Sequence, residues 1–152
     1  MEIERKFLVK TLPSSFENYR LRLIEQGYLS TIPTIRVRRD NNNYYLTYKS
    51  GGAGMSHEEA NLPLTEKSYL HLLEKADGYV ITKKRYEIPY GIHTIELDIF
   101  ENELEGLIIA EVEFTSEEEA LSFTPPEWFG DDVTGDTKYT NSDLSIFGKI
   151  PQ

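Results

Sequence analysis

The stretch EIERKFLV, residues 2–9, places a charged side chain at every other position and mostly apolar side chains between them. In a β-strand, side chains two positions apart share one face, so Glu2, Glu4 and Lys6 would point together into one space. The other face is mostly apolar and suits a hydrophobic core. We therefore expect the charged face of this strand to be enclosed, and not to be the ordinary wet side of a sheet.

The same alternation recurs along the chain as pairs of polar, mostly charged side chains two residues apart. The pairs are Arg36 and Arg38, Thr47 and Lys49, Lys83 and Arg85, Glu96 and Asp98, and Glu111 and Glu113. A single strand of this kind is usually the solvated outer face of a sheet. Several basic and several acidic strands are harder to explain in that way, because like charges opposite one another destabilise a sheet. A metal and an anionic ligand between acidic and basic strands would remove the difficulty.

The composition limits the class of protein. The chain has 152 residues and no cysteine, so we expect one domain over residues 1–152 without disulfides or a thiolate site. It begins with charged residues, and no stretch approaches the ~18 apolar residues of a membrane span. We therefore expect a soluble, cytoplasmic protein with no membrane partner.

The net charge is −10, which argues against nucleic acid as a partner. The inferred inward-facing set holds seven acids and six bases, so most of the negative surplus lies outside it. Its acids are Glu2, Glu4, Glu59, Glu96, Asp98, Glu111 and Glu113, and its bases are Lys6, Arg36, Arg38, Lys49, Lys83 and Arg85. One or two divalent cations would make this interior positive, as a small polyanionic ligand requires.

The local patterns predict mostly strands. Eight are expected, near residues 2–9, 22–30, 34–40, 43–50, 55–63, 79–89, 93–100 and 107–115. Helices are expected near 14–20, over 65–76 with Thr65 as N-cap, and over 116–123. Inward charge on antiparallel strands predicts a mainly β (α+β) fold, an eight-stranded antiparallel closed β-barrel with a few peripheral helices. Closure removes sheet edges and creates a lumen for a ligand.

Several of these segments also match a known family in sequence and in order. They are EIERKFLV at 2–9, QGYL at 26–29, IRVRR at 35–39, LTYKS at 46–50, KKRYEIP at 83–89, IELDIF at 95–100, IAEVEF at 109–114 and WFGDDVTGDTKYTN at 128–141. The chain resembles the CYTH superfamily, also called triphosphate tunnel metalloenzymes, and especially its short bacterial members that hydrolyse inorganic tripolyphosphate. The family's eight-stranded antiparallel tunnel agrees with the independent strand count.

The resemblance implies a role for each matching residue. The implied ligands of Mg²⁺ or Mn²⁺ are Glu2, Glu4, Asp98, Glu111 and Glu113. The implied phosphate-binding residues are Lys6, Arg36, Arg38, Lys49, Lys83, Arg85 and Lys138. Glu59 and Asp98 would hold a second ion or orient water, Tyr28 would tune Lys6, and Lys83 would stabilise the leaving oxygen.

Two positions depart from the family pattern. His57 stands where relatives usually carry an arginine, and Asn61 where an acid is common. A protonated His57 would donate to phosphate and a neutral one would only be a spacer, and the sequence leaves both open. Lys84 lies between two inward bases in the chain and is expected to point outward.

The leading hypothesis is metal-dependent hydrolysis of inorganic triphosphate, with weaker activity on nucleoside triphosphates, by a monomer or homodimer. An adenylate cyclase of class IV type would need to recognise base and ribose, and no segment is clearly dedicated to that task. Thiamine triphosphate is a third substrate, for which nothing apolar near the expected lumen argues specifically. A non-catalytic polyphosphate-binding module would keep the basic strands but could dispense with the paired carboxylates.

Overall fold

The computed structural model describes residues 1–51 and 54–152, and within them ten strands and six short helices. The strands are β1 (Glu2–Val9), β2 (Arg20–Thr31), β3 (Thr34–Asp40), β4 (Asn43–Lys49), β5 (Ser56–His57), β6 (Glu59–Pro63), β7 (Asp77–Tyr90), β8 (His93–Phe100), β9 (Ile108–Phe114) and β10 (Phe129–Asp132). The helices are α1 (Glu66–Leu73), α2 (Glu117–Ser122) and α3 (Asn141–Phe147), with 3₁₀ helices η1 (Phe16–Asn18), η2 (Asn102–Leu104) and η3 (Thr137–Tyr139).

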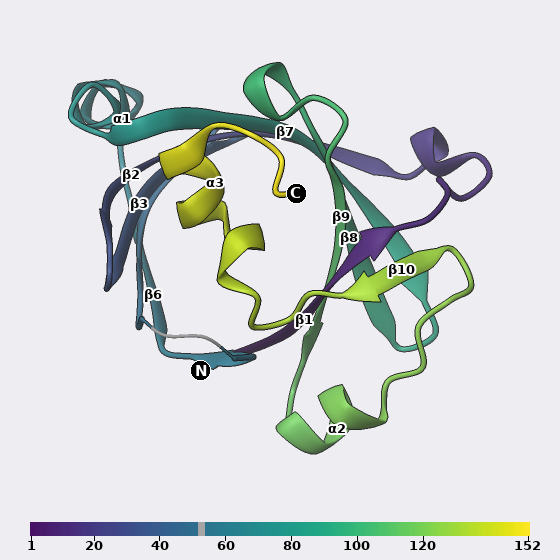
Figure 1. Ribbon diagram of the computed structural model, residues 1–152. Coiled ribbons are helices and arrows are strands. Elements are labelled where there is room, and N and C mark those ends of the chain that lie inside the picture. The colour runs from purple at the N-terminus through teal and green to yellow at the C-terminus, as the bar shows by residue number, and fades with distance from the viewer. Residues whose placement is uncertain (52–53) are drawn as a thin grey trace.

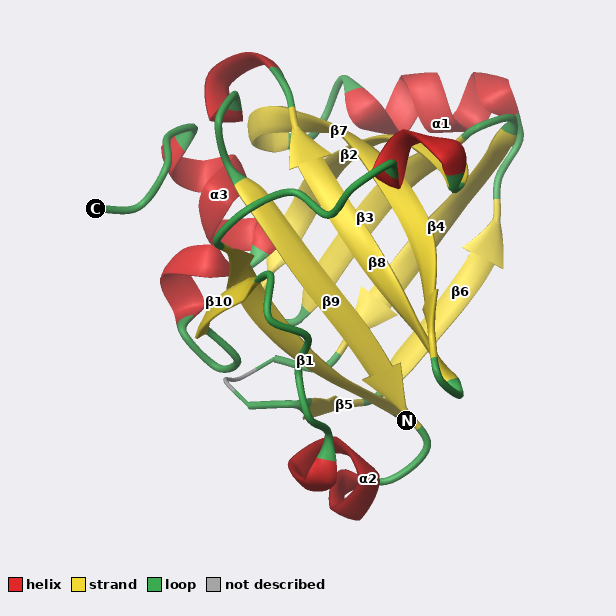
Figure 2. Cartoon of the chain, turned by 90° about the vertical axis from the view of Figure 1, so that its right-hand side faces the viewer, coloured by secondary structure: helices red, strands yellow, loops and turns green. Residues whose placement is uncertain are grey.

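The strands form one antiparallel sheet that closes on itself (Figure 1). Its order is β1-β9-β8-β7-β2-β3-β4-β6, and β5 pairs with the start of β1. Only Glu58 separates β5 from β6, so one interrupted strand joins β4 to β1 and completes the ring. Figure 2 shows the strands running obliquely side by side, as the tilt of a closed sheet requires.

The expected closed, mainly β fold is confirmed, but the expected count of eight strands was too low. The expected strand at 55–63 is interrupted at Glu58 and becomes β5 and β6. In addition, β10 pairs with the end of β1. Its sequence, Phe-Gly-Asp-Asp, has no alternation and contains residue types that are depleted in strands.

Two of the expected helices are confirmed. Thr65 caps α1, accepting a hydrogen bond from the backbone N–H of Ser68 and completing a capping box with it. Helix α2 begins after Ser116. The helix expected at 14–20 is only the three-residue η1, and α3 was missed because seven residues are too few for a clear helical period. Along the chain as the structure describes it, no helix is long and apolar enough to cross a membrane.

The outer face of the sheet carries a hydrophobic core. Phe7, Leu97 and Val112 lie on β1, β8 and β9 and pack against Phe123 and Phe129 of the segment around α2 and β10. These residues alternate with the charged ones in the same strands, so the charged residues face the lumen. The core therefore holds the strands in register and turns their charged faces inward.

A second apolar cluster fills one end of the lumen. Ile81, Phe100 and Ile109 lie on the inner face of β7, β8 and β9, and they pack around Leu144 of α3. In Figure 1, which looks down the ring of strands, α3 lies inside the ring. The lumen is thus packed with hydrocarbon at the α3 end, and the charged cavity occupies the remaining length.

Candidate functional site

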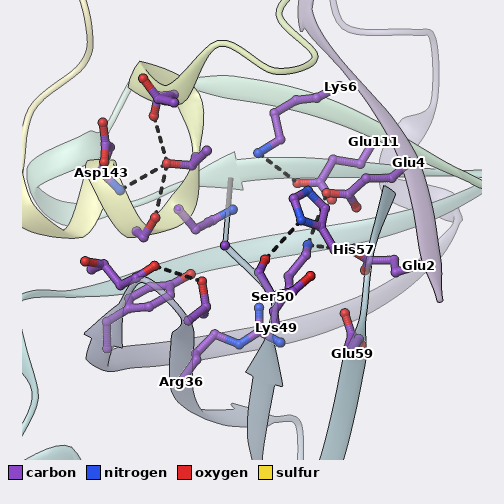
Figure 3. Close-up of a pocket in the computed structure, with 18 of the residues that line it drawn as sticks. Glu2, Glu4, Lys6, Arg36, Lys49, Ser50, His57, Glu59, Glu111 and Asp143 are labelled. Carbon is purple, nitrogen blue, oxygen red and sulfur yellow. Dashed lines mark hydrogen bonds and ion pairs between the residues drawn. The ribbon is translucent and has the colours of Figure 1, made fainter. Parts of the chain in front are cut away.

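A cavity of about 680 Å³ occupies the charged part of the lumen. Eleven of the fourteen predicted site residues line it: Glu2, Glu4, Lys6, Tyr28, Arg36, Arg38, Lys49, Glu59, Arg85, Glu111 and Glu113. Figure 3 shows that the labelled acidic and basic side chains among them point into a common space from several strands. Residues far apart in the sequence are therefore brought together on one inner surface, as the alternation predicted.

Three carboxylates form a compact cluster in this cavity. One oxygen each from Glu2, Glu4 and Glu113 lies within 4.8 Å of the others, and Glu4 stands opposite Glu113 in the β1–β9 ladder. Burial, together with the charge of Glu111, raises the pKa of Glu4 to about 8. Burial also raises the pKa of Glu2 to about 7, although Lys49 contacts both Glu2 and Glu4. Burial thus favours protonation of these carboxyl groups, and a cation bound among them would take the place of the protons.

Glu111 has the opposite environment, although it belongs to the same predicted set of metal ligands. Burial alone would raise its pKa, but Lys6 and Arg85 outweigh burial and hold the pKa well below its ordinary value. Their nitrogens lie 3.8 Å and 3.9 Å from its two carboxylate oxygens. The protein's own cations therefore stabilise the charged form of Glu111, whereas Glu2, Glu4 and Glu113 form the group of carboxylates that could hold a metal ion.

Two arginines of β3 lie on the basic side of the cavity. Arg38 donates from Nε to Oε1 of Gln26 at 2.7 Å, and Arg36 donates from Nη2 to Oγ1 of Thr47 at 3.1 Å. Within the part of the chain that the structure describes, the buried Nε of Arg36 has no hydrogen-bond partner. Burial, then the charge of Arg36, lowers the pKa of Arg38. Two neighbouring guanidinium groups that are partly removed from water and repel each other favour a bound anion.

Lys83 and Asp98 lie beneath the cavity wall and not on it. Both side chains are fully buried, and Nζ of Lys83 is 2.7 Å from Oδ2 of Asp98. Arg85 donates to both oxygens of the same carboxylate, at 2.7 Å and 2.8 Å. Burial lowers the pKa of Lys83 to about 8 despite this ion pair. Asp98, which the resemblance made a metal ligand, thus has its oxygens engaged by two cations of the protein.

Two further predicted residues lie differently from what the family pattern implied. Lys138 on η3 is 59% exposed, and its ammonium is 3.9 Å from the carboxylate of Asp136. It is not among the described residues that line the cavity. Tyr28 lines the cavity, but its hydroxyl accepts a hydrogen bond from Gln26, whereas Lys6 donates to the backbone oxygen of Tyr139.

The two positions that depart from the family pattern have local partners. The ring nitrogens of His57 lie 3.1 Å and 3.3 Å from the backbone oxygens of Ser50 and Gly54. Asn61 donates to Glu59 at 3.1 Å and accepts from Thr47 at 2.6 Å. The His57 ring on β5 thus contacts the backbone on both sides of the preceding loop, at Ser50 and Gly54. Asn61 orients Glu59. Lys84 is exposed, in agreement with the expected outward direction.

Other residues of the site were missed or not given a role. Arg22 lines the cavity and pairs with Asp40 on β3, Glu87 on β7 and Glu96 on β8. The signal was present, since Arg22 alternates with two leucines at the start of an expected strand. Asn141 of α3 also lines the cavity; it is the last residue of the family-matching segment 128–141, but it was given no role because it lies outside the alternating strands.

Comparison with known proteins adds independent information. The model of a family described as the CYTH domain matches residues 1–134. An inorganic triphosphatase of Nitrosomonas europaea is 40% identical over 151 residues, which cover 95% of this chain and 97% of that protein. An inorganic triphosphatase of Acetivibrio thermocellus is 38% identical over 154 residues, covering 94% and 92%. A crystal structure of an inorganic triphosphatase is 35% identical, covers 100% of this chain and 97% of its own, and superposes with a TM-score of 0.72.

Proposed function

The chain belongs to the CYTH domain family, and from this premise we propose that it hydrolyses inorganic triphosphate to pyrophosphate and phosphate inside its charged lumen. Relatives that carry the name inorganic triphosphatase cover nearly the whole chain at 38–40% identity. The observation that carries the proposal is the division of the cavity into a cluster of three converging carboxylates and a basic wall beside it. A metal–polyphosphate complex has the complementary distribution of charge.

The acidic cluster fits a hard divalent cation, Mg²⁺ or Mn²⁺. Glu2, Glu4 and Glu113 offer only oxygen donors, their oxygens converge, and burial raises the pKa of the first two. Mg²⁺ and Mn²⁺ prefer carboxylate and water ligands over nitrogen or sulfur. When bound, the ion would shield the negative charge of the phosphates and stabilise the charge that develops during transfer.

The basic residues would bind and orient the substrate. Arg36 and Arg38 can each present two N–H groups to phosphate oxygens, and Lys6, Lys49 and Arg85 add further positive charge around the same cavity. Asp98 would hold Arg85 in place through its two hydrogen bonds, and Lys83 would stabilise the leaving oxygen from beneath the wall. Lys138 is exposed and lies outside the cavity lining, so it would contact only a part of the substrate that extends out of the cavity.

The reaction would transfer the terminal phosphoryl group to water. Glu59 lines the cavity and is oriented by Asn61, so it is the carboxylate that we propose to direct the attacking water and accept its proton. The bond between the terminal phosphorus and the bridging oxygen breaks, and pyrophosphate leaves with the electron pair. Nucleoside triphosphates would react more slowly in the same site.

A substrate panel tests the proposal directly. The purified chain is incubated with Mg²⁺ or Mn²⁺ and one of five compounds: tripolyphosphate, pyrophosphate, ATP, thiamine triphosphate or long-chain polyphosphate. Released phosphate and cyclic AMP are measured. We expect tripolyphosphate to be hydrolysed fastest and activity to disappear with a chelator and return with excess metal. Cyclic AMP formation from ATP, or binding of tripolyphosphate without turnover, would contradict the proposal in favour of a cyclase or a binding module.

A further inference from the structure

We propose that Asn141, the first residue of α3, is a positioning residue. It would fix Lys83 directly and Arg38 through Gln26, and Arg38 belongs to the basic, phosphate-binding wall of the cavity. The inference rests on the proposed function of the cavity. Asn141 lies beyond residues 1–134, the part of the chain that the family model matches. Its side chain lines the cavity from a helix inside the ring of strands, and not from the strands that carry the other site residues.

One oxygen atom of Asn141 joins two otherwise separate groups. Its Oδ1 accepts a hydrogen bond from Nζ of Lys83 at 3.1 Å and another from Nε2 of Gln26 at 3.3 Å. Gln26 in turn accepts at Oε1 from Nε of Arg38 at 2.7 Å. A continuous row of hydrogen bonds therefore connects Arg38, a residue of the phosphate-binding wall, to the buried lysine beneath that wall.

Donor and acceptor chemistry fixes the orientation of this row. A lysine ammonium can only donate, so the terminal atom of Asn141 that faces it must be the oxygen. Gln26 is fully buried and uses its own oxygen for Arg38, so its amide nitrogen must find an acceptor nearby. Without Asn141, the acceptor left for that nitrogen in the described part of the chain is the hydroxyl of Tyr28 at 3.3 Å. Among the described residues, Lys83 would keep Asp98 as its oxygen partner.

Packing of α3 holds Asn141 at this place. Leu144 is fully buried in the apolar cluster at the end of the lumen, and Ser145 donates from Oγ to the backbone oxygen of Tyr79 at 2.8 Å. Gly78 permits the close approach, because a Cβ there would lie 2.5 Å from the backbone oxygen of Ser145. The packed helix thus carries a polar residue to a defined point of the charged wall.

The test compares Asn141→Ala with Ser145→Ala in the full chain. Ser145 anchors the same helix but does not line the cavity, so its variant reports what a loosened α3 does by itself. We expect Asn141→Ala to lower kcat/KM for tripolyphosphate by at least about tenfold, through loss of a hydrogen bond to a charged group. Ser145→Ala should lower the melting temperature and leave kcat/KM of the folded protein near the wild-type value.

A double-mutant cycle with Gln26→Ala separates positioning from general damage. If Asn141 acts through Gln26, kcat/KM of the Asn141→Ala/Gln26→Ala double variant should be little lower than that of the less active single variant. Both substitutions interrupt the same hydrogen bonds from Asn141 through Gln26 to Arg38. The inference would be overturned if the fold-loss of kcat/KM in the double variant equalled the product of the two single fold-losses. Wild-type kinetics in Asn141→Ala, or equal losses in Asn141→Ala and Ser145→Ala, would also overturn it.

The wild type in the same assay reports on the proposed function separately. An inactive wild type would overturn that function and this inference with it. An active wild type with a fully active Asn141→Ala variant would overturn only the role of Asn141.

Discussion

The two ends of the lumen differ sharply although the same strands form both. Along the inner face of β7, Ile81 lies in the apolar end, Lys83 at the boundary and Arg85 in the charged cavity. On β9, Ile109 lies in the apolar end, whereas Glu111 lines the cavity. One end is thus built like a protein core around α3, and the other resembles a binding site. The division shows that stability and ligand binding are separated along the axis of one sheet.

The two ends should contribute very differently to folding. A fully buried aliphatic or aromatic side chain is worth ~1.5–3 kcal/mol of stability, and the apolar end contains several of them. Buried ion pairs often contribute little, because their desolvation offsets their attraction. The charged cavity is therefore expected to be nearly neutral or costly for stability. We therefore interpret its charged side chains as ligand-binding groups. The apolar end and the outer core would offset the free energy lost by burying these charges.

The largest expected effect is that of Glu4→Gln in the charged cavity. It removes the negative charge of Glu4 and replaces one carboxylate oxygen of the acidic cluster by an NH2 group, with almost no change in volume. We expect kcat/KM for tripolyphosphate to fall by about a thousandfold, since a metal supplies several kcal/mol of transition-state stabilisation and each ~1.4 kcal/mol is a factor of ten. The control is Glu103→Gln, an exposed residue of η2 near the apolar end. Equal activity of the two variants in the phosphate-release assay would remove the metal-binding role of Glu4.

A smaller loss is expected on the basic wall. Arg38→Ala should lower kcat/KM by at least about tenfold, because a charge-assisted hydrogen bond is worth ~1.5–3 kcal/mol. The neighbouring Arg39 points outward and donates to the backbone oxygen of Asn41, so Arg39→Ala is a matched control with the same loss of charge. Steady-state kinetics of both variants measure the difference. Similar kinetics for the two would mean that net charge, and not the inward position, matters.

The apolar end should respond in the opposite way. Leu104→Ala removes a buried side chain of η2 from the cluster around Leu144. We expect the free energy of unfolding in urea to fall by ~2–5 kcal/mol, as for other buried leucines, while kcat/KM of the folded protein stays unchanged. A variant with wild-type stability, or a stable variant with low activity, would show that the two ends are not separate in function.

The smallest effect is expected when metal is added without substrate. A ligand that binds only the folded state stabilises it, so Mg²⁺ or Mn²⁺ should raise the melting temperature by a few degrees at about 10 Kd. Scanning calorimetry should show the same increment in Leu104→Ala and none in Glu4→Gln. If metal raised the melting temperature of Glu4→Gln as much as that of the wild type, the ion would bind elsewhere in the chain.

The sequence predicted which face of each strand is enclosed, but not how deep each residue lies. Alternation is the same for Asp98 and Glu111, and only the register of β7, β8 and β9 decides their partners. Asp98 thereby receives two cations at close range, while Glu111 lines the cavity. Depth along the lumen follows from pairing between distant segments, which a single sequence does not reveal.

The elements that were missed share a physical cause. The helix α3 and the strand β10 are short, and tertiary packing holds them in place, since Leu144 enters the apolar cluster and β10 pairs with β1. Their own sequences have too few residues for a clear period. Asn141 depends on that packing, so its position beside Lys83 and Gln26 could be known only from the structure.

X-ray diffraction at the manganese absorption edge, from crystals grown with Mn²⁺ and tripolyphosphate, tests most directly whether the charged half of the lumen is a metal–polyphosphate site. The account predicts an anomalous peak at coordination distance from the carboxylates of Glu2, Glu4 and Glu113, with phosphate density between that peak and Arg36 and Arg38. A peak confined to the outer surface, or a lumen without phosphate density, would contradict it.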